Sequence, residues 1–157
     1  MRIVAIAAAV AIGMAASSVA AVAADSDWVA RVKRVAGEAY VERDGVQAPL
    51  LVGDRLPASA VIVTGPKSGA GLTFRDNTRV SVGANARLGL ADYAFVPGQP
   101  AGAAMLKADL QNGAAAFVSG RITERQPGAM QVSTPAAVMG VRGTTFLAVT
   151  STPLDRQ

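Results

Sequence analysis

Hydrophobic and polar residues alternate along short segments of this chain. From Ala30 to Lys33 an apolar residue is followed each time by a charged one, which is the period-two pattern of a half-buried strand. Ala39–Arg43 runs into Asp44-Gly45, a pair that favours a hairpin turn because glycine accepts a positive φ. Ala60–Val63 is apolar throughout and suits a strand buried on both faces. These patterns predict a series of short strands.

The central segment has the clearest strand pattern. Apolar pairs recur roughly every eight positions with turn residues between them, the spacing of an all-β sandwich or barrel. The pairs are Leu72 with Phe74, Val80 with Val82, Leu88 with Leu90, and Tyr93 with Phe95. We therefore predict an all-β fold, a jelly-roll-like sandwich of about ten or more short strands. A β-solenoid-like fold is the alternative, although its repeats would resemble one another more closely.

The second half of the chain contains one ambiguous segment. Ala103–Leu110 favours a helix by propensity, although it lies within the series of strands, and Gly113 ends it in either case. Gln131–Ser133 and Thr145–Val149 are expected to be the last strands. Residues 151–157 form a polar C-terminal tail that we expect to be frayed.

The N-terminal segment indicates export. No charge follows Arg2 until Asp25, and the apolar run Ile3–Ala16 leads to small residues at Ala21–Ala24. We interpret residues 1–24 as a secretory signal peptide. An uncleaved anchor is the alternative, because about 20 uncharged residues can span a bilayer. We expect a periplasmic or secreted protein with one domain over residues 25–150 and no transmembrane helix after cleavage.

Composition removes many classes of function. The 157 residues include no Cys and no His, which excludes disulfides, zinc-thiolate sites, iron–sulfur clusters, Cys nucleophiles and histidine bases. The formal net charge is +4, but no Arg/Lys stripe is interleaved with aromatic residues, so we expect no nucleic-acid partner. The positive charge suits attraction to anionic envelope polymers or lipid headgroups.

No motif for catalysis, a cofactor or a metal is complete. The loop around Lys67-Ser68 lacks the second Walker glycine, because Pro66 occupies its place. Four aspartates lie beside turn residues, where they favour turns more than an acid/base pair of an envelope hydrolase: Asp44, Asp54, Asp76 and Asp92. Asp76, Asn77 and Asn85 match no calcium loop. We predict that the protein is not an enzyme and has no catalytic, cofactor or metal site.

Two further features allow a binding role. Trp28, Tyr93 and Phe95 could line a carbohydrate surface, but we favour core or rim positions because aromatics are few. Arg142 is the single charge between Val132 and Val149. We expect its guanidinium to be partly buried and to lock the structure, with contact to a ligand as the alternative.

An ordered set of short motifs resembles the FecR domain. The motifs are Gly37–Val41 with Asp44-Gly45, Gly53–Leu56, Thr64-Gly65, Leu72–Val80, Thr134-Pro135 and Gly140–Phe146. The FecR domain is the periplasmic domain of ferric-citrate-type transmembrane regulators. The resemblance covers about Val35 to Val149. The motif residues that we expect to be structural are Gly53, Asp54, Asp76, Thr134, Pro135, Gly140, Arg142, Gly143, Thr144 and Phe146.

The resemblance implies a jelly-roll-like fold and a non-enzymatic role in envelope signalling. In the regulators this domain receives a signal from an outer-membrane transporter and passes it to a sigma factor through a cytoplasmic segment. This chain has no such segment before its apolar run, so we do not carry the sigma-factor function over. We expect a stand-alone exported FecR domain that binds an envelope protein in signalling or assembly. The alternative is a cell-envelope polysaccharide-binding or structural protein.

Overall fold

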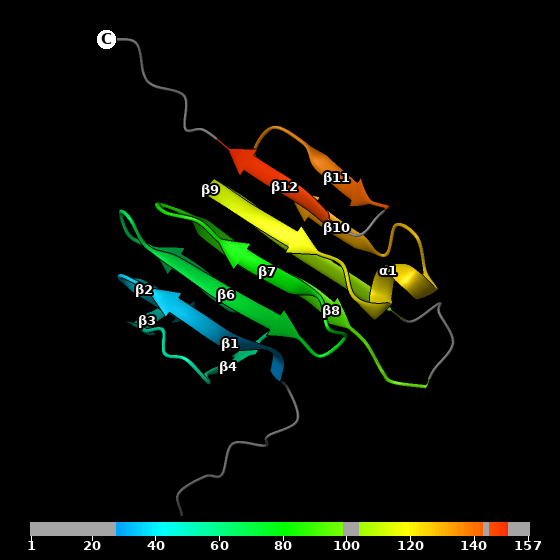
Figure 1. The fold of residues 1–157 in the computed structure, drawn as a ribbon, viewed down its shortest axis with the longest axis horizontal. Helices are drawn as coiled ribbons and strands as arrows, with labels where there is room; N and C mark the ends of the chain where they lie inside the picture. The colour runs from blue at the N-terminus through cyan, green and yellow to red at the C-terminus, as the bar shows by residue number, and fades with distance from the viewer. Residues whose placement is uncertain (1–27, 99–103, 143–144, 151–157) are drawn as a thin grey trace, which may run out of the picture.

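The fold is all-β, as the sequence pattern predicts. The computed structural model describes residues 28–98, 104–142 and 145–150 (Figure 1). The predicted signal peptide, residues 1–24, and the tail, residues 151–157, lie outside the described residues. The elements are β1 (Trp28–Ala36), β2 (Ala39–Arg43), β3 (Val46–Pro49), β4 (Arg55–Pro57), β5 (Val61–Thr64), β6 (Gly69–Phe74), β7 (Arg79–Val82), β8 (Arg87–Ala94), β9 (Met105–Val118), α1 (Arg121–Arg125), β10 (Met130–Ser133), β11 (Val138–Val141) and β12 (Thr145–Thr150).

The twelve strands form one curled sheet. We call β4, β1, β6, β7, the C-terminal part of β9 and β12 the front half. Strands β1, β6, β7 and β12 of this half lie toward the viewer in Figure 1. The rear half consists of β3, β2, β5, β8, the N-terminal part of β9, β10 and β11. Every pairing is antiparallel except that of β9 with β10. The stacked coils of a β-solenoid pair in parallel, so that alternative is wrong. The finer expectation of jelly-roll connectivity stays a prediction.

Strand β9 belongs to both halves. Its first part pairs with β8 and β10, and its second part pairs with β7 and β12. Gly113 lies where the partners change, with φ at 86°. A Cβ at Gly113 would approach the Cα and Cβ of Ala86 to 2.6 Å, so both the backbone angle and the space require glycine there.

The described part of Ala103–Leu110, the segment with helical propensity, belongs to strand β9. Residues 105–110 are strand because Leu106, Ala108 and Leu110 alternate inward, and because partners on both sides satisfy the backbone. The helix alternative for Ala103–Leu110 is therefore wrong over the described residues. Pairing between distant strands outweighs the local propensity.

The core lies between the two halves. Alternate residues of nearly every strand point into one hydrophobic cluster, and the largest fully buried side chains include Leu72 and Phe117 from the front half and Ile62 and Leu88 from the rear half.

Strand β5 differs from the sequence prediction for Ala60–Val63. Ile62 is buried, but Val61 and Val63 are half-buried, so this strand is not buried on both faces as predicted, because the sheet has only one inner side.

The predicted turns are present where they were expected. Asp44 and Gly45 both have positive φ, at 50° and 79°, between β2 and β3. Asn77, at 70°, turns the chain between β6 and β7. No helix in the part of the chain that the structure describes has the length and apolarity to cross a membrane.

Candidate functional site

The C-terminal strands form one edge of the molecule (Figure 1). Among the described residues β11 pairs with β10 alone, and β12 pairs with β9 alone. Each strand therefore has one side on which its backbone N–H and C=O groups meet no other described strand. We call β11 and β12 the C-terminal edge.

Side chains on β12 alternate between the core and solvent. Phe146 is half-buried and stacks on Phe117 with ring centroids 4.7 Å apart and planes within 1°, while Ala148 is buried. Leu147 and Val149 point the other way and are 64% and 65% exposed. Inward stacking fixes the strand on the core, and its outward face is left apolar.

The C-terminal edge carries no charge in its strands. Val138 on β11 is 69% exposed, and neither β11 nor β12 contains Lys, Arg, Asp, Glu or Pro. Charged residues and proline are the usual protection of an edge strand against pairing with another chain. This edge therefore lacks that protection.

Thr134 and Pro135 begin the turn that joins β10 to β11. The N–H of Thr134 donates to the carbonyl of Ala137 at 2.8 Å, and its hydroxyl accepts the N–H of Ala137 at 3.1 Å. Pro135 follows directly and is exposed. A structural role for these motif residues stays a prediction.

Gly140 and Arg142 differ from the expectation. Arg142 is exposed, so the prediction of a partly buried guanidinium is wrong. Among the described residues, nothing lies within 4 Å of a Cβ built at Gly140, whose φ is not in the left-handed region, so no described atom opposes a side chain there. The uncharged surroundings of Arg142 reflect an edge that faces solvent, where a charge needs no buried partner. Gly143 and Thr144 lie outside the described residues.

Asp76 anchors a buried polar network. Its side chain is fully buried; one carboxylate oxygen accepts the hydroxyl of Thr78 at 2.6 Å and the N–H of Ile122 at 3.4 Å. The other oxygen accepts the N–H of Thr78 at 3.3 Å and the hydroxyl of Tyr93 at 3.4 Å. Thr78 in turn accepts the N–H of Gly120 at 3.0 Å. The network ties the β6–β7 turn to β8 and to the start of α1.

Tyr93 and Gly120 show how tightly this network is built. Burial, and then the negative charge of Asp76, raise the pKa of the Tyr93 hydroxyl well above its usual range. A Cβ at Gly120 would collide with the carbonyl of Asp76 and the N–H of Thr78. The motif residue Asp76 therefore stands in a structural network rather than in an acid/base pair.

Gly53 and Asp54 form the turn before β4. Gly53 has a φ of 98°, and its N–H donates to the carbonyl of Val32 at 2.9 Å. The carboxylate of Asp54 accepts the N–H of Leu51 at 2.9 Å. These contacts are local and agree with the turn-forming role expected from the sequence.

The remaining carboxylates of the described residues form no cluster. Asp92 pairs with Lys107 at 3.1 Å, and Glu42 pairs with Arg87 at 2.8 Å. Among the described residues no three His, Cys, Asp or Glu side chains gather in a way that could hold a metal ion.

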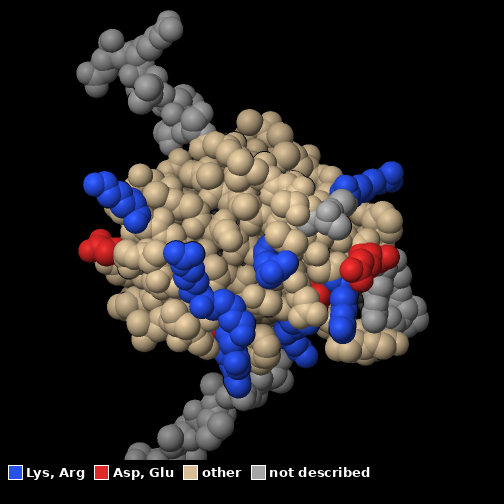
Figure 2. Space-filling model, viewed as in Figure 1, with Lys and Arg blue, Asp and Glu red and all other residues tan. Residues whose placement is uncertain are grey.

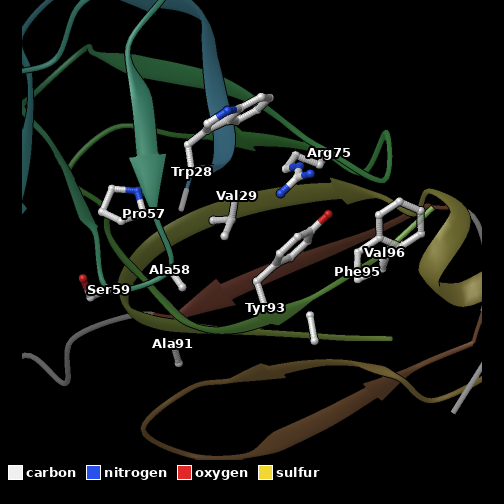
Figure 3. A pocket seen from close by; sticks show the side chains of 11 residues that line it. Trp28, Val29, Pro57, Ala58, Ser59, Arg75, Ala91, Tyr93, Phe95 and Val96 are labelled. Carbon is white, nitrogen blue, oxygen red and sulfur yellow. The ribbon is translucent and has the colours of Figure 1, made fainter. Parts of the chain in front are cut away.

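Trp28, Tyr93 and Phe95 are brought together in one pocket (Figure 3). The pocket lies at the start of β1 and the end of β8, has a volume of about 650 Å³, and is also lined by Arg75. The sequence indicated aromatic residues at a core or rim, and Phe95 is buried while Trp28 and Tyr93 are half-buried. Arg75 was not foreseen, because nothing local in the sequence connects the β6–β7 turn with Trp28.

The exposed aliphatic residues of the edge were also missed. The sequence predicts a strand at Thr145–Val149, but only the pairing of β12 shows that its outer face and one side meet no other described element. An apolar residue at an outward position has the same sequence pattern whether another sheet covers it or solvent does.

Comparison with known proteins gives one match. The model of the family described as FecR protein matches residues 60–155. The match begins later than the resemblance near Val35, so Gly53 and Asp54 lie outside it. No curated protein and no solved structure matches the chain.

Proposed function

The chain belongs to the FecR protein family, whose domain is of a regulatory or signalling type, and we propose that it is a non-enzymatic envelope protein that acts by binding another protein. In this proposal it is periplasmic or secreted and works in signalling or assembly. The observation that carries the protein-binding role is the uncharged C-terminal edge, with Leu147 and Val149 exposed on β12.

The edge suits binding by strand addition. A partner segment in extended form can pair with the backbone of β12 and gain main-chain hydrogen bonds over its six residues. Leu147 and Val149, two positions apart, would enter apolar pockets on the partner. Arg142, exposed just after β11, would supply a charged contact at the end of this surface. Contact with a ligand is the alternative role of Arg142 from the sequence analysis, and the exposure of its side chain supports that role.

The experiment is an affinity capture from envelope extract with the protein and the variant Leu147→Lys. A lysine at an outward position of an edge strand opposes strand addition without disturbing the core. We expect the variant to keep its melting temperature and to lose the captured partner. Val46→Lys, at a 69% exposed position on the edge strand β3, is the matched control and should capture the partner normally. Equal capture by all three proteins would contradict strand addition at β12.

Location is tested separately. If residues 1–24 are a signal peptide, the intact mass of protein recovered from the periplasm will match a chain that starts at Ala24 or Asp25. Recovery of the full-length chain from the membrane fraction would contradict cleavage.

A second candidate function rests on the charge of the front half. Its strands contain Arg and Lys but no Asp or Glu, counting β9 from residue 113, and Figure 2 shows basic side chains over this face with acidic ones toward its margins. An acid-free basic face attracts anionic envelope polymers. Sedimentation with purified cell-wall polymer tests this function: Arg34→Gln on β1 should weaken binding, and Arg121→Gln on α1, also exposed, should not. Equal effects would contradict a specific role for the front face.

A further inference from the structure

Three arginines surround the ring of Trp28. The guanidinium carbons of Arg31, Arg55 and Arg75 lie 5.6, 5.7 and 5.6 Å from its ring centroid. They come from β1, from β4 and from the turn between β6 and β7. Attraction to the ring offsets part of the repulsion among the three cations, and the ring thereby holds them together. The result is a concentrated positive charge at one end of the front half.

Within the described part of the chain, this charge is not neutralised by ion pairs at Arg31 and Arg75. Neither forms one with a described carboxylate, and Nε of Arg31 is buried without a hydrogen-bond partner there. Asp76, next to Arg75, is buried and shares its oxygens with Thr78, Tyr93 and Ile122. Asp25 and Asp27 precede Trp28 in the sequence and lie outside the described residues.

The pocket beside this cluster is largely apolar. In Figure 3 the side chains of Trp28 and Arg75 stand over Tyr93, and Phe95 and Val96 continue the wall. Val29, Pro57, Ala58, Ala91 and Ala94 complete its apolar lining. The hydroxyl of Tyr93 accepts the N–H of Asp76 at 3.0 Å and is therefore already engaged. The lining thus presents an apolar wall with a cation at one side.

We propose that this pocket binds an anionic amphiphile, a molecule in which a phosphate or carboxylate is joined to a short apolar group. The anion lies at Arg75, where Arg31 and Arg55 add to the positive potential, and a planar guanidinium matches either acid. The apolar part lies against Phe95 and Val96. A neutral sugar is a poorer fit, because recognition of its hydroxyls needs several free polar groups and the lining offers few. This site is separate from the C-terminal edge and does not depend on the proposed protein partner.

Trp28 provides the assay, because it is the single tryptophan of the chain. The purified protein is titrated with octyl phosphate below its micelle concentration while tryptophan emission is followed. We expect a saturable change with octyl phosphate, and binding at least about tenfold weaker for inorganic phosphate, which lacks the chain, and for octyl glucoside, which lacks the charge. Equal binding of octyl glucoside or of inorganic phosphate, or no saturable change, would overturn the proposal.

Two charge-matched variants locate the site. Arg75→Gln should weaken octyl phosphate binding about tenfold, since a charge-assisted contact is lost. Arg79→Gln removes the same charge from an exposed position on β7 outside the pocket and should change binding less than about twofold. Melting temperatures of both variants confirm folding, because both side chains are exposed. Equal weakening by the two variants would show diffuse attraction and overturn the proposal.

Phosphatidylglycerol vesicles then distinguish two sources of the ligand. Displacement of octyl phosphate by vesicles supports a lipid headgroup presented by a bilayer. Binding of octyl phosphate without displacement supports a soluble amphiphile. Either result is consistent with the pocket chemistry, whereas vesicle binding that Arg75→Gln leaves unchanged would place the contact elsewhere and overturn the proposal.

Discussion

The hydroxyl of Thr78 donates a 2.6 Å hydrogen bond to the buried carboxylate of Asp76, two residues before it in the chain. The same hydroxyl oxygen accepts the N–H of Gly120, forty-two residues later. A short-range bond and a long-range bond thus meet at one atom. The conformation of the turn between β6 and β7 therefore depends on the segment that begins α1. The conformation of that segment depends equally on the turn.

Thr78→Val should destabilise the protein by about 2–4 kcal/mol. Valine keeps the shape of threonine but leaves the N–H of Gly120 and one oxygen of Asp76 short of a buried partner. Chemical denaturation measures the change in the free energy of unfolding. Thr78→Ser restores the hydroxyl and should recover much of the loss. An unchanged stability of Thr78→Val would show that the network contributes little.

Tyr93 should make the protein less stable at alkaline pH. Its pKa is raised in the folded state, so the folded protein keeps the proton when the unfolded chain, with a pKa of about 10, loses it. This contribution is complete below about pH 10 and declines above it by about 1.4 kcal/mol per pH unit until the folded-state pKa is reached. The measurement is the unfolding free energy between pH 9 and pH 11, compared with Tyr93→Phe. Tyr93→Phe removes the titration, so parallel curves for the two proteins would contradict the prediction.

Gly113→Ala should cost about 3 kcal/mol or more. The position combines a positive φ with a Cβ site only 2.6 Å from Ala86, so strain and collision add. Thermal unfolding gives the change. Gly128→Ala, also at positive φ but with open space around the Cβ site, is the control and should lose less. An equal loss at both positions would mean that the backbone angle alone matters.

Arg142→Ala should change stability by less than about 0.5 kcal/mol, because the side chain is exposed. A loss of 2–4 kcal/mol would instead indicate a structural lock of the kind expected from the sequence. Parallel capture from envelope extract separates the two roles. If Arg142 contacts the partner, capture should weaken while the melting temperature stays the same.

Local features of this fold were predictable from the sequence. The pair Asp44-Gly45 and the residue Asn77 produce their turns through backbone preferences that act within a few residues. The series of strands followed from period-two alternation in the same way.

Features that depend on distant partners were not predictable. Residues 105–110 have helical propensity, and only β8 and β10 make them strand. The uncharged neighbours of Arg142 predict a buried partner for it, yet those neighbours form an edge rather than an interior. Trp28 and Arg75 are neighbours because β1 and β6 are paired. No local sequence pattern predicts which strands pair. The C-terminal edge and the pocket beside Trp28 both depend on such distant partners, so the sequence alone did not predict them.

The shared strand β9 has a consequence for the order of folding. Strands β7 and β8 follow one another in the chain, but each pairs with β9, so strand pairing links the two halves only through β9. A nascent chain that ends before residue 105 has two incomplete sheets whose inner faces cannot be held together by this strand. Long-range pairings of this kind delay folding until the late segment has been synthesised. Unfolding should then be cooperative, because withdrawal of β9 removes the strand pairing of both halves at once.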